Sequence, residues 1–337
     1  MEELYSTEGD YGLRTLSEPD EAYVDVVFVH GLTGNRETTW THKQTKTFWP
    51  QTLLGGDLVN ARILTFGYDA DIIGVLKMAG SNTLRDHGKS LANDLALRRM
   101  KSCSNQRPLI FVAHSLGGLV VEQALLIARG AAQQHLKDIL ESTAAIAFMG
   151  TPHCGSTHAD WATPLTRLSK ALRRTNSQIV QVLEPGSEIL ANLGQEFHTM
   201  LDDRIRNQKQ TIEIFCFYEE LPVTGIGKIV PDHSAILSAY PNRSIHGNHM
   251  DMTKFSSAKD AGYAAVSDQL WLWADTLKKK TEAQCIEEIR ERRNKKFGTM
   301  QDVGSSVYSG SVNSGGGPVF QGNQSAGRDF NVNQGFR

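Results

Sequence analysis

The sequence predicts an α/β fold in which a mostly parallel β-sheet is covered by helices. Several short runs are apolar at nearly every position, as expected for strands buried on both faces, and they occupy residues 23–29, 62–66, 108–112, 143–148 and 211–217. Segments with the apolar periodicity of helices lie between or after these runs, at 83–100, 118–129 and 258–279. This alternation is typical of strand–helix–strand units, whose strands run parallel.

Length and composition exclude several classes of protein. The chain has 337 residues, 40% of them hydrophobic and 21% charged, which suits one large α/β domain with appendages. The net charge of −2 argues against a nucleic-acid partner. The four cysteines are scattered without a CxxC pair, and no GxxxxGK[ST], GxGxxG or HExxH motif occurs, so we expect neither a metal site nor a cofactor.

The strongest catalytic signal is the segment FVAHSLGG, which follows the run at 108–112 and opens a helix-like stretch. A serine in this strand–turn–helix context is the nucleophile elbow of the α/β-hydrolase fold. Because the elbow is a tight and strained turn, the residues flanking the serine must be small, and Ala113 and Gly117 are. We therefore predict the α/β-hydrolase fold, with Ser115 as the nucleophile.

A second element, HGLTGN, follows the first strong strand. Acyl transfer needs two hydrogen-bond donors aimed at the developing oxyanion. We expect these to be the backbone N–H groups of Leu116, directly after the nucleophile, and of Leu32, in the loop after the HG pair. On this interpretation His30 has a structural role and is not the general base.

In this fold the base follows the last strand, and the chain order is serine, acid, histidine. The segment IHGNHMDM lies just before the closing helical stretch. We choose His249 as the base because it lies in the loop that enters the final helix, and His246 is the nearby competitor. Asp251 is expected to be a loop or cap residue.

The acid must accept the other imidazole N–H of the base. Glu219 follows the run at 211–217, where a carboxylate at the end of a strand is expected, and we favour it. Glu220 and Asp232 remain alternatives.

The chain divides into segments of different composition. Residues 1–20 form a polar lead-in and 21–280 the hydrolase domain, in which a polar helical stretch at about 155–208 is expected to be a lid. Residues 281–303 read as a charged linker helix. Basic clusters around this linker predict peripheral contact with acidic lipid, although interleaved glutamates favour a solvated linker.

The last 34 residues, 304–337, contain eight glycines and only three charged residues, so they cannot form a core. The pattern of an aromatic followed by glycine repeats at an offset of twelve: Tyr308 and Gly310 correspond to Phe320 and Gly322. Such a repeat suits stacked strand–turn layers, and we expect self-assembly through residues that include Tyr308, Gly310, Gly315, Phe320, Gly322, Gly327 and Phe330.

Several of these motifs together carry a resemblance over about residues 22–275: HGLTGN, RILTFGYDAD, FVAHSLGGLVVEQAL, IAFMGTPHCGS, IEIFCFYEELP, VPDHSAIL and GNHMDMTKF. This part of the chain resembles lipase-like hydrolases that include the serine-active-site-containing and GPI-inositol-deacylase-related proteins. The resemblance implies a triad at Ser115, an acid in the FYE segment, and the late histidine. It also implies an ester or lipid substrate.

The tail, YSGSVNSGGGPVFQGNQSAGRDFNV, is similar to the prion-like σ motif of SesB-type fungal death-pathway hydrolases. That resemblance implies a partner of the NLR receptor type with a matching motif, which templates amyloid assembly of the tail. It further implies an effector of fungal immune or incompatibility cell death. The alternative is an adaptor whose hydrolase fold is dispensable and which signals through the tail.

The N-terminus, MEELYSTEGDYG, is acidic and has no apolar run, and no stretch of the chain is long enough to span a bilayer. We therefore expect a cytoplasmic protein that associates with an intracellular or plasma membrane when it is active.

Overall fold

The structure is a computed structural model, and it describes residues 9–31, 34–69, 80–153, 167, 187–207 and 209–303. The chain divides into two compact units, Met1–Leu277 and Lys278–Arg337. The strands are β1 Gly12–Ser17, β2 Val24–Val29, β3 Ala61–Gly67, β4 Leu109–His114, β5 Thr143–Met149, β6 Glu213–Glu219 and β7 Asn242–Ile245. The helices are α1 Trp49–Thr52, α2 Leu54–Asp57, α4 Gly80–Lys101, α5 Leu116–Gly130, α6 Gln134–Ser142, α8 Ser187–Arg206, α9 Asp232–Ala235 and α10 Ala261–Val303.

The strands form one seven-stranded sheet in the order β1-β3-β2-β4-β5-β6-β7. Only the edge strand β1 is antiparallel, to β3, and the other neighbouring pairs are parallel. This sheet, together with a sharp turn at Ser115 between the central strand β4 and helix α5, is the α/β-hydrolase fold that the sequence predicts.

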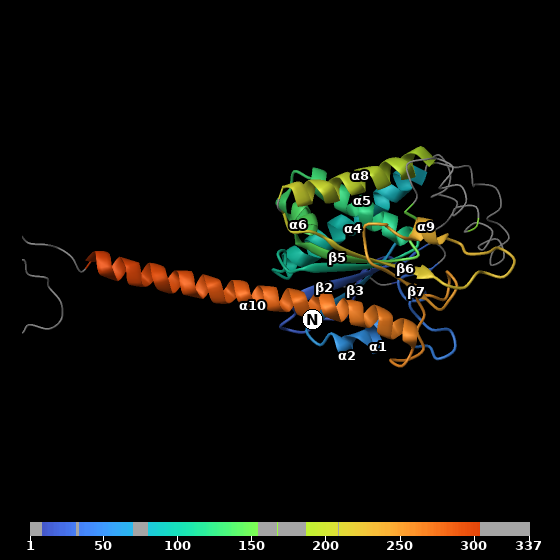
Figure 1. Cartoon of the computed structure of the whole chain (residues 1–337), viewed down its shortest axis with the longest axis horizontal. Helices are drawn as coiled ribbons and strands as arrows, with labels where there is room; N and C mark the ends of the chain where they lie inside the picture. Colours follow the sequence, from blue (N-terminus) through green and yellow to red (C-terminus); the bar gives the residue numbers. More distant parts are fainter. Residues whose placement is uncertain are drawn as a thin grey trace, which may run out of the picture. The chain divides into compact units, whose positions relative to one another are not determined.

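The sheet separates two hydrophobic cores. Helices α4, α5, α6 and α8 cover one face, and α1 and α2 lie on the other (Figure 1). Strand β2 shows why both faces are apolar: Val27 and Val29 belong to the first core, while Val26 and Phe28 belong to the second. The second core also takes buried side chains from the first part of α10, such as Tyr263, Val266 and Leu270.

Three elements correct or extend the expectations from sequence. Strand β1 lies within the segment 1–20 that the sequence suggested was a polar lead-in, because Leu13 and Leu16 are buried when β1 pairs with β3. Strand β7 was not predicted, since its four residues are mostly polar. The expected closing and linker helices are one helix, α10, which has neither proline nor glycine between residues 263 and 297.

The expected lid at 155–208 lies largely outside the described residues. Its last part is α8, which buries Leu193, Phe197, Met200 and Leu201 in the same core as α5. These residues therefore cover the sheet.

A buried charge cluster holds together the amino-terminal ends of the strands, away from the ends that carry the predicted catalytic residues. Asp25 on β2 is fully buried, and its register partner Arg62 on β3 donates to both carboxylate oxygens, at 2.9 and 2.6 Å. Arg99 from α4 and Arg107 from the loop before β4 also bond to Asp25, at 2.5 and 3.0 Å. One buried carboxylate thus contacts three guanidinium groups drawn from three parts of the fold, and the carboxylate of Glu18 lies 3.4 Å from one of them, that of Arg62.

We expect Asp25→Asn to lower the free energy of unfolding by about 3–5 kcal/mol, because it leaves buried arginines without their counter-charge. Urea unfolding followed by circular dichroism measures the change. Asp20→Asn, at an exposed position, is the matched control and should stay within about 0.5 kcal/mol of wild type. Equal stability of the two variants would contradict this account of the cluster.

Candidate active site

The candidate site lies at the carboxyl ends of the parallel strands, where the loops of neighbouring strands meet. His30 follows β2, Ser115 follows β4, Gly150 follows β5, and Glu219 ends β6. His249 lies in the loop after β7. Open α/β sheets bind their ligands at this edge.

Ser115 occupies a strained backbone conformation at the tip of the elbow. Its φ of 53° and ψ of −129° lie in a region that non-glycine residues rarely adopt. The turn is held on the sheet side, where the Ser115 N–H donates to the carbonyl of Met149 at 2.9 Å. The residue is only 1% exposed.

Two glycines allow the chain to pack against this turn. A Cβ on Gly31 would lie 2.7 Å from the Cβ of Ser115, so the HG loop crosses directly against the nucleophile. A Cβ on Gly117 would lie 2.3 Å from the carbonyl oxygen of His30. The small residues around the elbow are therefore required by the loop that passes over it.

His249 lies beside the nucleophile. Its Nε2 is 2.9 Å from the Oγ of Ser115, and its side chain is fully buried. The competitor His246 is largely exposed and pairs with Glu220, 3.3 Å from its Nδ1. The structure thus brings together the serine and the histidine that the sequence favoured.

Glu219 contacts both the backbone N–H and the ring Nδ1 of His249. Its Oε2 accepts the backbone N–H of His249 at 3.1 Å, and its Oε1 lies 3.4 Å from the Nδ1 of His249. Oε1 also accepts the N–H of Val230 at 2.7 Å. Of the two alternative acids, Glu220 faces His246, and Asp232 pairs with Lys228 at 2.7 Å. Only Glu219 among the three faces the base.

His30 is a structural residue of the HG loop, as the sequence suggested. Its Nδ1 lies 2.8 Å from the carbonyl oxygen of Gly31, and its Nε2 accepts the N–H of Tyr68 at 3.2 Å. The ring stacks on Tyr68 with centroids 4.4 Å apart. Burial lowers the pKa of His30 to about 4 despite the bond to Gly31. It is therefore neutral near pH 7, with both ring nitrogens engaged.

His114 is a positioning residue that the sequence analysis did not identify. Its Nε2 donates to the backbone carbonyl of His249 at 2.9 Å, so the base is held by His114 at its carbonyl and by Glu219 at its N–H. Burial, and then the nearby His249, lower the pKa of His114 well below its usual value, so it stays neutral. Its place directly before the nucleophile was a signal for this role, but its partner is 135 positions away.

The loop after β5 is fixed by a buried ion pair. His153 Nδ1 lies 3.1 Å from Glu122 of α5, and both side chains are at most 4% exposed. Burial lowers the pKa of His153, but hydrogen bonding with Cys216 and Glu122 and the charge of Glu122 outweigh it and raise the pKa to about 9. The same loop places Gly150 against the His249 ring, where a Cβ would lie 3.1 Å from the Cε1 atom.

One of the two expected oxyanion donors lies in the described part of the chain. Leu116 is the first residue of α5, so its N–H is among those that a helix leaves without an intrahelical acceptor. Leu32 lies outside the described residues.

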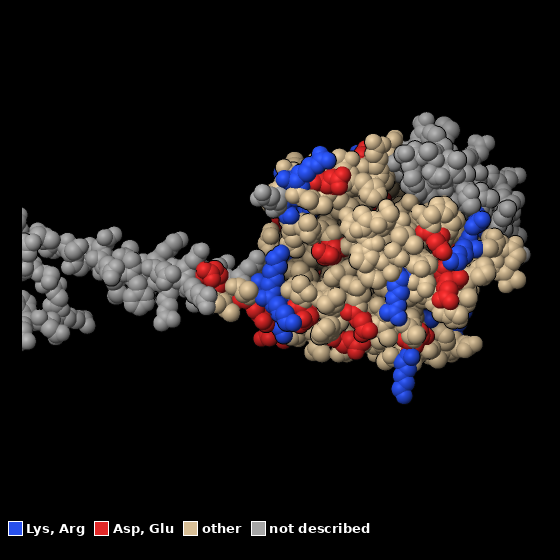
Figure 2. All heavy atoms as spheres, in the orientation of Figure 1, with Lys and Arg blue, Asp and Glu red and all other residues tan. Residues whose placement is uncertain are grey.

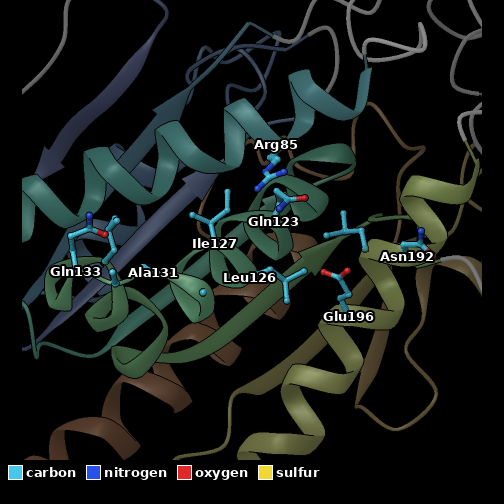
Figure 3. Close-up of a pocket in the computed structure, with 12 residues that line it drawn as sticks. Arg85, Gln123, Leu126, Ile127, Ala131, Gln133, Asn192 and Glu196 are labelled. Carbon is cyan, nitrogen blue, oxygen red and sulfur yellow. The ribbon is translucent and has the colours of Figure 1, made fainter.

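A large cavity of about 740 Å³ is separate from this site. It lies among α4, α5, α6 and the start of α8, and neither Ser115 nor His249 lines it (Figure 3). Within the described residues, no group of three or more His, Cys, Asp or Glu side chains is placed to hold a metal ion.

Part of the chain, which includes Ser115, matches a known protein family. Residues 25–178 match the family described as "Putative serine esterase (DUF676)". The matched segment includes Ser115 and ends before Glu219 and His249.

The esterase-like part of the chain is also similar to Protein SERAC1. The protein from Danio rerio is 30% identical over 253 residues, which cover 68% of this chain and 36% of the relative. The human protein is 28% identical over 269 residues, covering 73% and 38%. The matched region thus spans little more than a third of the length of these relatives. The similarity confirms the resemblance to serine-active-site-containing hydrolases and gives no support to the fungal death-pathway resemblance of the tail.

Among solved structures, Paleococcus ferrophilus monoacylglycerol lipase has a TM-score of 0.40 and 11% identity, covering 77% of this chain and 98% of its own. A haloalkane dehalogenase variant from Bradyrhizobium elkanii has a TM-score of 0.43 and 11% identity, covering 81% and 95%.

Replacing Glu219 by Gln should lower kcat on a p-nitrophenyl ester by about a hundredfold to ten-thousandfold, because the amide cannot stabilise a positively charged His249. Glu220→Gln removes the same charge from the neighbouring residue and is the control, expected to stay within about twofold of wild type. The thermal unfolding temperature of both variants shows whether a loss of activity comes from the missing charge or from a destabilised fold. A fully active Glu219→Gln enzyme would assign the acid elsewhere.

Proposed function

We propose that this protein is a serine hydrolase that cleaves ester bonds, with Ser115, His249 and Glu219 as its catalytic triad. The observation that carries the proposal is the 2.9 Å contact between Ser115 Oγ and His249 Nε2 at the tip of a left-handed elbow. A buried serine at 1% exposure, in a strained turn and facing a buried imidazole, is the arrangement of an activated nucleophile.

In the first half of the reaction, His249 Nε2 takes the proton of Ser115 as Oγ attacks the ester carbonyl carbon. For Nε2 to accept this proton, Nδ1 must carry the other, and it faces Glu219 Oε1 at 3.4 Å. The carboxylate then stabilises the imidazolium. The N–H of Leu116, together with that of Leu32, would stabilise the oxyanion.

Collapse of the tetrahedral intermediate breaks the ester C–O bond, and His249 returns its proton to the leaving alkoxide as an alcohol departs. Ser115 is left acylated. Water then attacks the acyl carbon as His249 accepts one of its protons, and the carboxylic acid leaves as that proton returns to Ser115 Oγ. The net reaction is ester plus water to acid plus alcohol.

The proposal is supported by the serine esterase family matched over residues 25–178 and by the similarity to SERAC1. The substrate class we propose is an ester, including lipid esters.

Within the described residues, no helix combines the length and the apolar character that crossing a bilayer requires. On the face drawn in Figure 2, acidic and basic side chains are interspersed, and this face shows no extended basic surface of the kind that binds nucleic acid.

The decisive experiment is labelling with a fluorophosphonate probe, which reacts with activated serines. Wild type should be labelled, and Ser115→Ala should not. The kcat/KM of Ser115→Ala on p-nitrophenyl butyrate should be lower than that of wild type by about a thousandfold or more. His249→Gln should fall by a similar factor, and the double variant should be little worse than either, since the triad acts as a unit.

Ser238→Ala, at an exposed position, is the control and should label as wild type does. A well-folded wild-type protein that takes no label would make the dispensable-scaffold alternative the leading one. Label that persists in Ser115→Ala would move the nucleophile to another serine.

We further propose, from the sequence resemblance alone, that residues 304–337 assemble in templated fashion and make the hydrolase an effector of a cell-death pathway, partnered by an NLR-type receptor. This segment lies outside the described residues. The offset-of-twelve repeat that includes Tyr308 and Phe320 supports the proposal. Assembly would raise the local concentration of hydrolase domains and favour peripheral membrane contact.

A peptide of residues 304–337 is expected to form thioflavin-positive fibres, and Phe320→Lys or Tyr308→Lys should abolish them, because a repeated charge cannot stack in register. In the full chain, adding preformed fibres should increase fluorophosphonate labelling. Charged variants that assemble as readily as wild type would exclude the stacked-layer arrangement.

A further inference from the structure

A second, smaller pocket adjoins the candidate active site. Its volume is about 270 Å³, and it is lined by Gly34, Thr38, Thr39, Thr41, Lys43, Lys46, His114, Met250, Thr253 and Lys254. His114 directly precedes the nucleophile and Met250 directly follows the base, so each Cα lies about 3.8 Å from that of a proposed catalytic residue. The pocket is therefore built on the same loops as the triad.

The charges around this pocket do not balance. Lys43 lies 3.2 Å from Asp251, and Lys254 lies 3.7 Å from the same carboxylate oxygen. No ion pair is formed by Lys46 with any residue that the structure describes. Three ammonium groups and one carboxylate leave a net charge of +2, and the remaining titratable group of the lining, His114, is neutral.

Lys254 is the most buried of these three lysines. Its side chain is only 12% exposed, and its ammonium group donates to the backbone carbonyl of Met250. Burial, and then repulsion by Lys43, lower its pKa, although Asp251 acts in the opposite direction. An anion in the pocket would relieve the repulsion between these lysines.

The rest of the lining also suits an anion. Four threonines and one glycine make up half of the ten lining residues, and Met250 is the one apolar side chain of appreciable size among them. Ammonium groups near hydroxyls are a common environment for carboxylate and phosphate oxygens.

We propose that this pocket binds an anionic group of the substrate, a carboxylate or a phosphate, so that the hydrolase selects esters carrying negative charge near the bond to be cleaved. The inference rests on the proposed hydrolase function and narrows it to a substrate class. Lys43, Lys46 and Lys254 act as specificity residues, and they take no part in the proton transfers at Ser115.

The substrate test compares two esters that share a leaving group: neutral p-nitrophenyl butyrate and anionic p-nitrophenyl hydrogen succinate. Wild type should prefer the anionic ester in kcat/KM at low salt. Lys46→Gln should lower the anionic-to-neutral ratio by about three- to tenfold, mainly through KM, because one uncompensated charge is removed. The preference should weaken as salt rises.

Lys89→Gln is the matched control, since Lys89 is an exposed lysine of α4 outside the pocket lining. It should leave the ratio unchanged. A wild-type enzyme with no preference for the anionic ester, or an equal loss on both esters in Lys46→Gln, would overturn the proposal while leaving the hydrolase function in place.

A binding measurement tests the pocket without depending on hydrolysis. Inorganic phosphate is titrated into the full-length protein and its variants. Ser115→Ala should bind phosphate as tightly as wild type does. Lys46→Gln should bind it several-fold more weakly than Lys89→Gln does. Phosphate binding that is absent, or that Lys46→Gln does not weaken, would overturn the anion site. Intact phosphate binding by a protein that cleaves neither ester would support the site and overturn the hydrolase proposal.

Discussion

The left-handed backbone at Ser115 is the constraint on which the rest of the site depends. A non-glycine residue at φ 53° persists only where its surroundings hold it. Here the holding contacts come from several directions: the carbonyl of Met149 accepts the Ser115 N–H, and the HG loop lies across the turn at a distance that only Gly31 permits. The parallel central strands make both contacts possible, because they bring the ends of β2, β4 and β5 to one edge.

The base is positioned mainly through its backbone. Glu219 accepts the N–H of His249, and His114 donates to its carbonyl, so the imidazole is held against Ser115 by two buried side chains from the ends of β6 and β4. Glu219 also accepts the Val230 N–H. It therefore links β6 to the loops that follow β6 and β7, in addition to facing the imidazole. A charged group with several backbone donors is costly to remove, which is why its loss would affect both position and chemistry.

The charged side chains are arranged differently at the two ends of the sheet. At the amino-terminal ends, Asp25 is bonded to three arginines in a largely buried cluster. At the carboxyl ends, Asp251 is shared between Lys43 and Lys254, and Lys46 adds a further charge beside them. The pocket of about 270 Å³ borders the second arrangement, where an anion would complete the balance of charge. The first is explained by the fold alone.

The sequence by itself determined the parallel sheet and the nucleophile elbow, and it favoured the serine and the histidine that the structure brings together, because strand burial and tight turns leave strong local patterns. Apolar runs mark β2, β4 and β5, and the small residues around Ser115 mark the elbow. The choice among Glu219, Glu220 and Asp232 was decided only by the tertiary structure, because three nearby acids look alike in sequence and differ in which of them faces His249. The tertiary structure alone also decided β1 and β7, which become strands by pairing with the sheet edges. It likewise decided the role of His114 and the pocket lined by Lys43, Lys46 and Lys254. Their partners lie far away along the chain, and local sequence carries no record of such distances.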